Sequence, residues 1–458
     1  MNNINKKTIT HQTILGILFV ICCIFNQIKV FSIISFMGFI IYLILLNYKK
    51  PIFFLKYLAV IIGIVLTVNG VLLIELCENR FLIELYTTSK YIGALPLYIL
   101  IWYIFLSSIQ LYELKFKPKI NKEDFNEYKS LNILSILTLL LYIGLFMQVY
   151  QHPAFILGVD RFEYFKYYPL NSFWEKIDHI TGFLLIFPIF SIVYQKKSLG
   201  ILTIIVYILY YIWNGNKFGP FFNLMIVFFL VYYKQIYNYS KSNIRRITKY
   251  GFIIFSCLFI FTLLIVYNSG VNLENYIWNR ASQQGQLWWK IFSITQGETH
   301  VLEFGDEILG IIEGTPGNSN LIGANNGIYK IMYISAPESI IDAKLETGSR
   351  YTEAGIASIY YYFGALGSII VIFFIGTIFA FTVNSLLESI SYNNLIAAMI
   401  LLRIFLIERT FLSMFIMYDF FKPLSLIGYI YLMLFWNKKP YISTKNGLKI
   451  IYKRYKNA

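Results

Sequence analysis

The sequence has few charged residues, few cysteines and no nucleotide-binding motif, and each shortage excludes a class of protein. Only 14% of the 458 residues are charged, whereas a soluble protein has about 25%. The four cysteines and the four histidines show no metal-ligand spacing, so neither a disulfide framework nor a metal site is expected. P-loop, Rossmann and HExxH motifs are missing. We therefore expect no cofactor, and an activated substrate would have to arrive in the membrane.

Long apolar runs dominate what is present. They reach the length of about 18 residues or more that a helix needs to cross a bilayer, and only helix or closed barrel satisfies the backbone there. The sequence therefore predicts an all-α polytopic integral membrane protein with about twelve transmembrane helices. The predicted spans are residues 12–27, 30–47, 52–74, 91–112, 131–149, 178–195, 198–213, 219–236, 250–268, 355–382, 393–407 and 421–436.

Lysine and arginine placement predicts the orientation of these spans. The net charge of +15 arises mainly from clusters in alternate connecting segments, as the positive-inside rule describes. We read it as a membrane pattern, with no nucleic-acid partner. Both termini are then predicted to be cytoplasmic.

The same pattern divides the chain into four parts. The predicted parts are a bundle of nine spans (1–268), a large extracytoplasmic loop with interfacial helices (269–354), three further spans (355–436) and a basic cytoplasmic tail (437–458). The loop begins with an aromatic stretch, Tyr276–Trp289, that is typical of one amphipathic helix on the membrane interface.

Five basic residues fall on the predicted outer side, which otherwise has little positive charge. Guanidinium groups bind phosphate oxygens in bidentate fashion, and a lysine adds a point charge. A ring of such groups suits a diphosphate leaving group. For each residue alone, snorkelling or headgroup contact is the competing interpretation. The five are Arg161, Lys217, Arg280, Arg350 and Arg409.

Carboxylates and histidines are the other candidates. Glu353 follows Arg350 and precedes a span, so it could pair with that arginine, position substrate or act as a base. Glu408 and Arg409 interrupt an apolar region, which suggests either function or a structural pair with Arg403. His152 and His300, on the outer side, could serve as a base, although a surface or packing role is more common.

Span ten carries three adjacent tyrosines and two glycines. Tyr360 could line a sugar path or belong to an aromatic belt at the interface. Gly364 and Gly367 would allow close approach between helices.

The segment Gly348–Gly367, with Arg350, Glu353, Gly355 and Tyr360 through Gly364, resembles the signature of Wzy-type oligosaccharide repeat-unit polymerases. The turn Asn214–Gly219 is similar to a basic turn of that family, with Lys217 at the position of its arginine. Arg280 with Gln283, Gln284 and Gly285 resembles the arginine–glutamine element that opens its large loop.

The resemblance implies a glycosyltransferase of O-antigen or capsule synthesis in the bacterial cytoplasmic membrane. Undecaprenyl-diphosphate-linked oligosaccharides would be both donor and acceptor, and a chain-length regulator and a flippase would be further partners. Arg280, Arg350, Glu353 and Arg409 would be catalytic, whereas Arg161, Lys217, Gln284 and Tyr360 would bind diphosphate or sugar.

Two alternatives stay open. An O-antigen ligase would share the architecture and donor, but we would expect a histidine close to the loop arginines. A lipid-linked oligosaccharide flippase would have short loops, so the long loop speaks against it.

Overall fold

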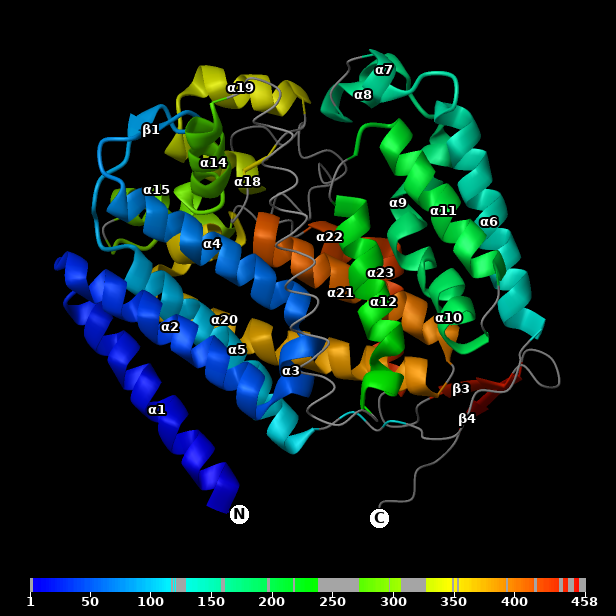
Figure 1. Ribbon diagram of the computed structural model, residues 1–458, viewed down its shortest axis with the longest axis horizontal. Coiled ribbons are helices and arrows are strands. Elements are labelled where there is room, and N and C mark those ends of the chain that lie inside the picture. The colour runs from blue at the N-terminus through cyan, green and yellow to red at the C-terminus, as the bar shows by residue number, and fades with distance from the viewer. Residues whose placement is uncertain are drawn as a thin grey trace. The chain divides into compact units, whose positions relative to one another are not determined.

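A computed structural model shows the fold (Figure 1). The residues described are 3–116, 118, 120, 129–157, 161–195, 198–216, 219–237, 272–295, 297–305, 327–347, 350–351, 354–392, 394–415, 418–435, 440–443 and 449–452. The chain forms two compact units. The first comprises Met1–Lys115, Tyr239–Ala380 and Glu408–Tyr418, and the second comprises Phe116–Asn238, Phe381–Ile407 and Asp419–Ala458.

The first unit contains an apolar helical bundle and a set of shorter helices and strands. Its elements are α1 (Asn3–Ile24), α2 (Lys29–Lys49), α3 (Pro51–Lys56), α4 (Leu58–Leu76), β1 (Phe81–Leu82), β2 (Thr87–Thr88), α5 (Leu95–Lys115), α14 (Leu273–Ser282), α15 (Gln286–Thr295), α18 (Gly327–Ser335) and α19 (Glu338–Thr347). Two helices, α20 (Ala354–Ser391) and α21 (Leu395–Met414), are shared between the units.

Helix α5 is the core of the bundle in the first unit. Its continuous run of large apolar residues buries most of its surface, with Tyr98, Ile99 and Phe105 fully covered. Helices α1, α2 and α4 pack around it, as Figure 1 shows. A helix that is apolar on all sides is buried in this way because every face can pack.

The start of the predicted loop is where the structure differs from the sequence-based expectation. The stretch Tyr276–Trp289 forms two helices, α14 and α15, separated by a turn at Gln283–Gly285. A Cβ on Gly285 would lie 2.7 Å from the carbonyl carbon of Gly70 on α4. The turn packs that closely on α4 because neither glycine has a side chain, so the prediction of one continuous helix is wrong.

Helix α20 is also interrupted. Gly364 has φ +64° and ψ −167° inside the element, a backbone region open essentially only to glycine. A Cβ there would lie 2.8 Å from Cγ2 of Thr299. Gly364 therefore breaks the helix and lets residues of the loop approach, whereas we had expected close approach of another helix.

The second unit is a separate helical bundle with a short hairpin. Its elements are α6 (Lys129–Val149), α7 (Ala154–Leu157), α8 (Arg161–Tyr167), α9 (Ser172–Leu184), α10 (Ile186–Gln195), α11 (Ser198–Trp213), α12 (Gly219–Tyr237), α22 (Tyr418–Phe421, at the unit boundary), α23 (Pro423–Phe435), β3 (Pro440–Ser443) and β4 (Lys449–Tyr452). Strands β3 and β4 pair antiparallel, a hairpin that the sequence analysis had not predicted in the basic tail.

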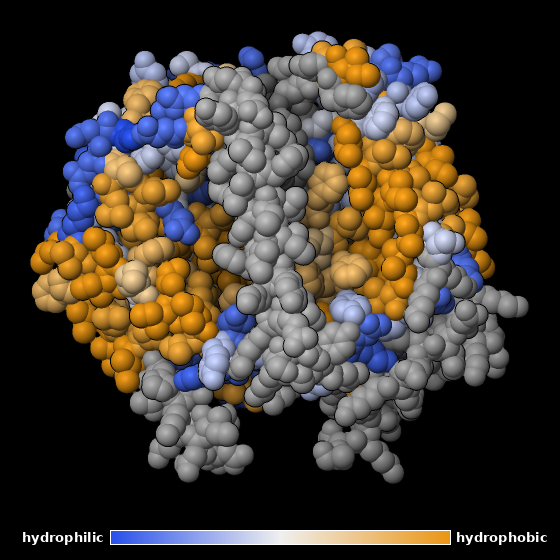
Figure 2. Space-filling view, viewed as in Figure 1, coloured by the Kyte–Doolittle hydropathy of each residue, from blue (hydrophilic) through white to orange (hydrophobic). Residues whose placement is uncertain are grey.

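The described helices support a membrane protein. Seven of them are long and apolar enough to cross a bilayer by length and composition, and α11 and Gln12–Ile24 are shorter apolar helices. Apolar side chains cover broad areas over α1 and α2 in the first unit, and over α6 and α11 in the second (Figure 2). Exposed apolar side chains of these helices include Ile24 on α1, at 67% exposed, and Ile133 on α6, at 58%. The predicted span 250–268 lies outside the described residues, and the number of twelve spans stays a prediction.

Candidate functional site

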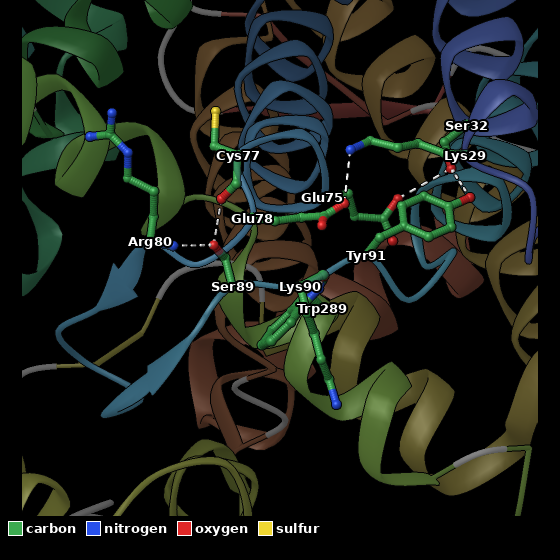
Figure 3. Close-up of polar contacts among 10 residues, drawn as sticks. All are labelled: Lys29, Ser32, Glu75, Cys77, Glu78, Arg80, Ser89, Lys90, Tyr91 and Trp289. Carbon is green, nitrogen blue, oxygen red and sulfur yellow. Dashed lines mark hydrogen bonds and ion pairs between the residues drawn. The ribbon is translucent and has the colours of Figure 1, made fainter.

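The scaffold of the candidate site is the segment between α4 and α5. Its strands β1 and β2 pair in register Phe81 with Thr88. Ser89 closes the base of this hairpin, because its Oγ donates to the main-chain oxygen of Cys77 at 2.5 Å and accepts from the Arg80 amide at 3.0 Å. Figure 3 shows these contacts beside the ion pair of Lys29 with Glu78 (2.8 Å). The hairpin is therefore held on the end of α4.

Three tryptophans attach the first loop helices to that segment. The indole N–H groups of Trp278, Trp288 and Trp289 donate to the main-chain oxygens of Phe81, Ala94 and Lys90, each at 3.1 Å. All three rings are buried. A buried indole needs a partner for its N–H, and here the partners come from the hairpin segment. These aromatics thus anchor α14 and α15 to protein, and the expected place of this stretch on the membrane interface stays a prediction.

Glu84, at the tip of the hairpin, is the residue on which the candidate site converges. Its carboxylate accepts from Lys344 Nζ at 2.9 Å, from the Gln283 amide at 3.5 Å and from the Gln286 amide. Its main-chain oxygen accepts from the hydroxyl of Tyr351. Sequence reasoning missed this residue because it lies in a short connection with no motif.

Arg280 and Arg350 are each linked to Glu84 through one other residue, Gln283 for the first and Tyr351 for the second. Arg280, exposed at the end of α14, donates from Nη1 to Oε1 of Gln283 at 3.4 Å. Arg350 directly precedes Tyr351, and its guanidinium lies 5.8 Å from the ring centre of Tyr329 on α18. Two segments that carry arginines 70 positions apart in the sequence thus both bond Glu84, one at its carboxylate and one at its main-chain oxygen. Lys344 adds a positive charge to this Glu84 cluster.

A second cluster surrounds His300. Its Nδ1 lies 2.9 Å from Oε1 of Glu303, whose Oε2 contacts Lys330 Nζ at 2.7 Å and accepts from the Tyr361 hydroxyl at 2.9 Å. The imidazole stacks on the Tyr361 ring, with centres 4.1 Å apart and planes 5° apart. The His300 amide also bonds the carbonyl of Tyr362, at 3.1 Å, just before the break at Gly364.

Helix α18 connects the two clusters, since consecutive residues serve each of them. Tyr329 faces Arg350, and Lys330 pairs with Glu303. The cluster of the histidine is therefore joined, through two adjacent residues of α18, to the residue that contacts Arg350. Glu303 and Lys330 had no sequence signal, because the pairing depends on how the loop folds back on α20.

The Glu303 carboxylate should stabilise the fold at neutral pH and cease to do so in acid. Burial raises the pKa of its carboxyl, but hydrogen bonds from Lys330 and Tyr361 and the charge of Lys330 outweigh it, so the pKa lies below the ordinary 4.5. A carboxyl with a lowered pKa stabilises the fold at neutral pH, and this contribution is lost as pH falls through the folded-state pKa. Glu303→Gln should therefore lower the thermal midpoint in detergent at pH 7 and cease to differ from the wild type in acid.

The matched control is Glu298→Gln, an exposed carboxylate on the same segment. It should leave the midpoint unchanged throughout the titration. A Glu303→Gln deficit that stays constant from neutral pH into acid would show that the carboxylate charge is not what matters.

The remaining predicted site residues divide into three groups. Tyr360 is 3% exposed and packs on Trp288 and Phe292, with ring centres 5.0 and 5.7 Å apart, so its position is that of a core residue. Gln284 lies in the turn beside Gly285 and is partly exposed. Arg409 is partly exposed on α21. Lys217, Glu353 and the side chain of Arg161 lie outside the described residues, and the ring of five stays a prediction.

The second unit has a polar cluster of its own that sequence reasoning did not single out. Oδ1 of Asp178 on α9 accepts from the hydroxyls of Tyr210 (2.8 Å) and Tyr211 (3.3 Å) on α11. Tyr211 also shares a hydrogen bond with Thr181 at 2.6 Å. Within the described ranges, no group of three or more histidine, cysteine, aspartate or glutamate side chains could hold a metal ion.

Comparison with known proteins gives one match. Residues 322–430 match a family of unknown function, DUF6418. The matched region contains Arg350, the break at Gly364 and Arg409. No curated protein and no solved structure matches this chain. The match therefore covers the part of the site from α18 to α21.

Proposed function

We propose that this protein is a membrane glycosyltransferase that polymerises oligosaccharide repeat units carried on undecaprenyl diphosphate at the outer face of the bacterial cytoplasmic membrane. The growing chain on one lipid diphosphate is the donor. A sugar hydroxyl at the non-reducing end of a new lipid-linked unit is the acceptor. Support comes from the apolar helices and from the resemblance of Gly348–Gly367 to Wzy-type polymerases. It also comes from the bonds that join the Arg280 and Arg350 segments to Glu84.

The observation that carries the proposal is that the segments of Arg280 and Arg350 both bond Glu84. These are the two arginines that the resemblance assigns to the large loop and to the start of span ten. Gln283 and Tyr351 join their segments to Glu84. Two guanidinium groups on segments held at one residue suit a diphosphate, because each can bind two phosphate oxygens.

The chemistry follows from that arrangement. The acceptor oxygen forms a bond to the anomeric carbon of the donor, and the bond from that carbon to the diphosphate oxygen breaks. The diphosphate leaves with the electron pair, and the hydroxyl proton passes to a base. Negative charge grows on the leaving group in the transition state, where preorganised cations lower the barrier most.

The deciding experiment incubates purified protein with lipid-linked repeat units and no nucleotide sugar. The expected product is a ladder of lengthening chains. No ladder, together with accumulation of single repeat units on the inner leaflet in cells that lack the protein, would identify a flippase.

One observation favours an O-antigen ligase as the second candidate. A ligase is expected to hold a histidine near its loop arginines, and α18 places the His300 cluster next to the Arg350 contact. A ligase would transfer the lipid-linked chain to a lipid A–core acceptor and would make no ladder from repeat units alone. Supplying each acceptor separately distinguishes the two activities.

A further inference from the structure

We propose that Glu84 is a positioning residue that holds Arg280 and Arg350 in one diphosphate-binding arrangement. This inference rests on the proposed function, since it concerns the same site. It assigns a role to the short connection between α4 and α5, which neither the sequence motifs nor the family match covers.

The first reason is that Glu84 is mounted on a rigid support. Leu82 and Leu85 on either side of the tip are buried, at 1% and 2% exposure. Ser89 closes the base of the hairpin (Figure 3). The hydroxyl of Tyr91 donates to the Asn26 carbonyl at 2.6 Å and ties the segment to the connection between α1 and α2. A side chain on such a support keeps its place when neighbouring loops move.

The second reason is the number of elements that meet at this residue. The carboxylate bonds Gln283 in the turn, Gln286 on α15 and Lys344 on α19. Its main-chain oxygen accepts a hydrogen bond from the hydroxyl of Tyr351, a residue that is 1% exposed. One residue thus joins the turn after Arg280 to the residue after Arg350.

The third reason is electrostatic. The Glu84 carboxylate lies 2.9 Å from Lys344 Nζ and also accepts from Gln283, the residue that Arg280 contacts. The Glu84–Lys344 pair is about one-fifth exposed on each side, so solvent screens it less than a surface pair. The carboxylate therefore holds Lys344 and the partner of Arg280 in place before the diphosphate arrives.

The test measures binding of undecaprenyl diphosphate to protein in nanodiscs, and the kcat/KM for chain lengthening. Glu84→Ala should weaken binding and lower kcat/KM by between about tenfold and 10²-fold, because a misplacement of the order of 1 Å has this effect. Glu78→Ala, an exposed carboxylate from the same segment, is the control and should change neither quantity. The thermal midpoint shows whether Glu84→Ala still folds.

A double-mutant cycle separates positioning from a structural role. If Glu84 acts through Arg280, the Glu84→Ala change should have a much smaller effect in an Arg280→Ala background. The double variant Glu84→Lys with Lys344→Glu reverses the ion pair but keeps it. In a protein that retains Arg280, it should bind undecaprenyl diphosphate more tightly than Glu84→Ala does.

Three results would overturn the proposal. They are wild-type binding by Glu84→Ala, an equal loss in both backgrounds, and a wild-type protein that binds no undecaprenyl diphosphate. A wild-type protein that binds this lipid but lengthens no chain would refute the polymerase alone, and the binding cycle would then decide the role of Glu84.

Discussion

Replacement of Arg350 by alanine should stop chain lengthening while the protein still inserts into the membrane. The loss of one preorganised donor to a developing negative charge costs on the order of 10² to 10³ in rate. Arg350 belongs to the matched family region and lies beside Tyr329. Cells with this variant should display single repeat units, and the purified protein should show the same loss in the ladder assay.

Two further variants sharpen this test. Arg350→Lys keeps the charge but lacks the bidentate fork, so its rate should fall between those of the wild type and Arg350→Ala. Arg80→Ala removes an arginine of the same unit whose side chain is 42% exposed and paired with Glu274, and it should have little effect. Long polysaccharide from Arg350→Ala would refute the diphosphate site.

Gly355→Ala should lower the stability of the fold strongly. The added Cβ would lie 2.5 Å from the carbonyl carbon of Leu412, and closer still to the main-chain oxygens of Phe411 and Leu412. Backbone atoms cannot rotate away as a side chain can, so the start of α20 must move off the end of α21. Overpacking of this kind costs about 1–3 kcal/mol or more.

The measurement is the thermal midpoint in detergent together with the ladder assay, because the displaced segment begins five positions after Arg350. Gly63→Ala on α4 is the control, since a Cβ there meets nothing within 4 Å. Alanine also favours helix, so this variant should be as stable as the wild type or slightly more so. Equal midpoints for both variants would contradict the tight contact of α20 with α21.

Most helix positions could be predicted from the sequence, because an apolar run of the right length has few alternatives to helix in a bilayer. The run at 198–213 became α11 with the same bounds, and the run at 131–149 became α6 with two residues added. The predictions were wrong at positions where tertiary contacts decide the backbone conformation. The Gln283–Gly285 turn and the break at Gly364 form because other segments approach those glycines closely, and periodicity does not contain that information.

The candidate site was predictable in part. Arg280 and Arg350 stand out by charge on the predicted outer side and by the motifs around them. Glu84, Glu303 and Lys330 do not stand out, because a single charged residue in a connection normally faces solvent. Their importance comes chiefly from partners 27 to 267 positions away.

The sequence by itself determined the class of protein, the places of its apolar helices and the two arginines, since these depend on composition and local pattern. Only the tertiary structure decided that both arginine segments meet at Glu84 and that α18 contacts both Arg350 and the Glu303 partner of His300. Hydrophobic burial acts on runs of residues, so its pattern can be recognised in the sequence. Hydrogen bonds and ion pairs act between single atoms about 3 Å apart, and their partners are chosen only when distant segments fold together.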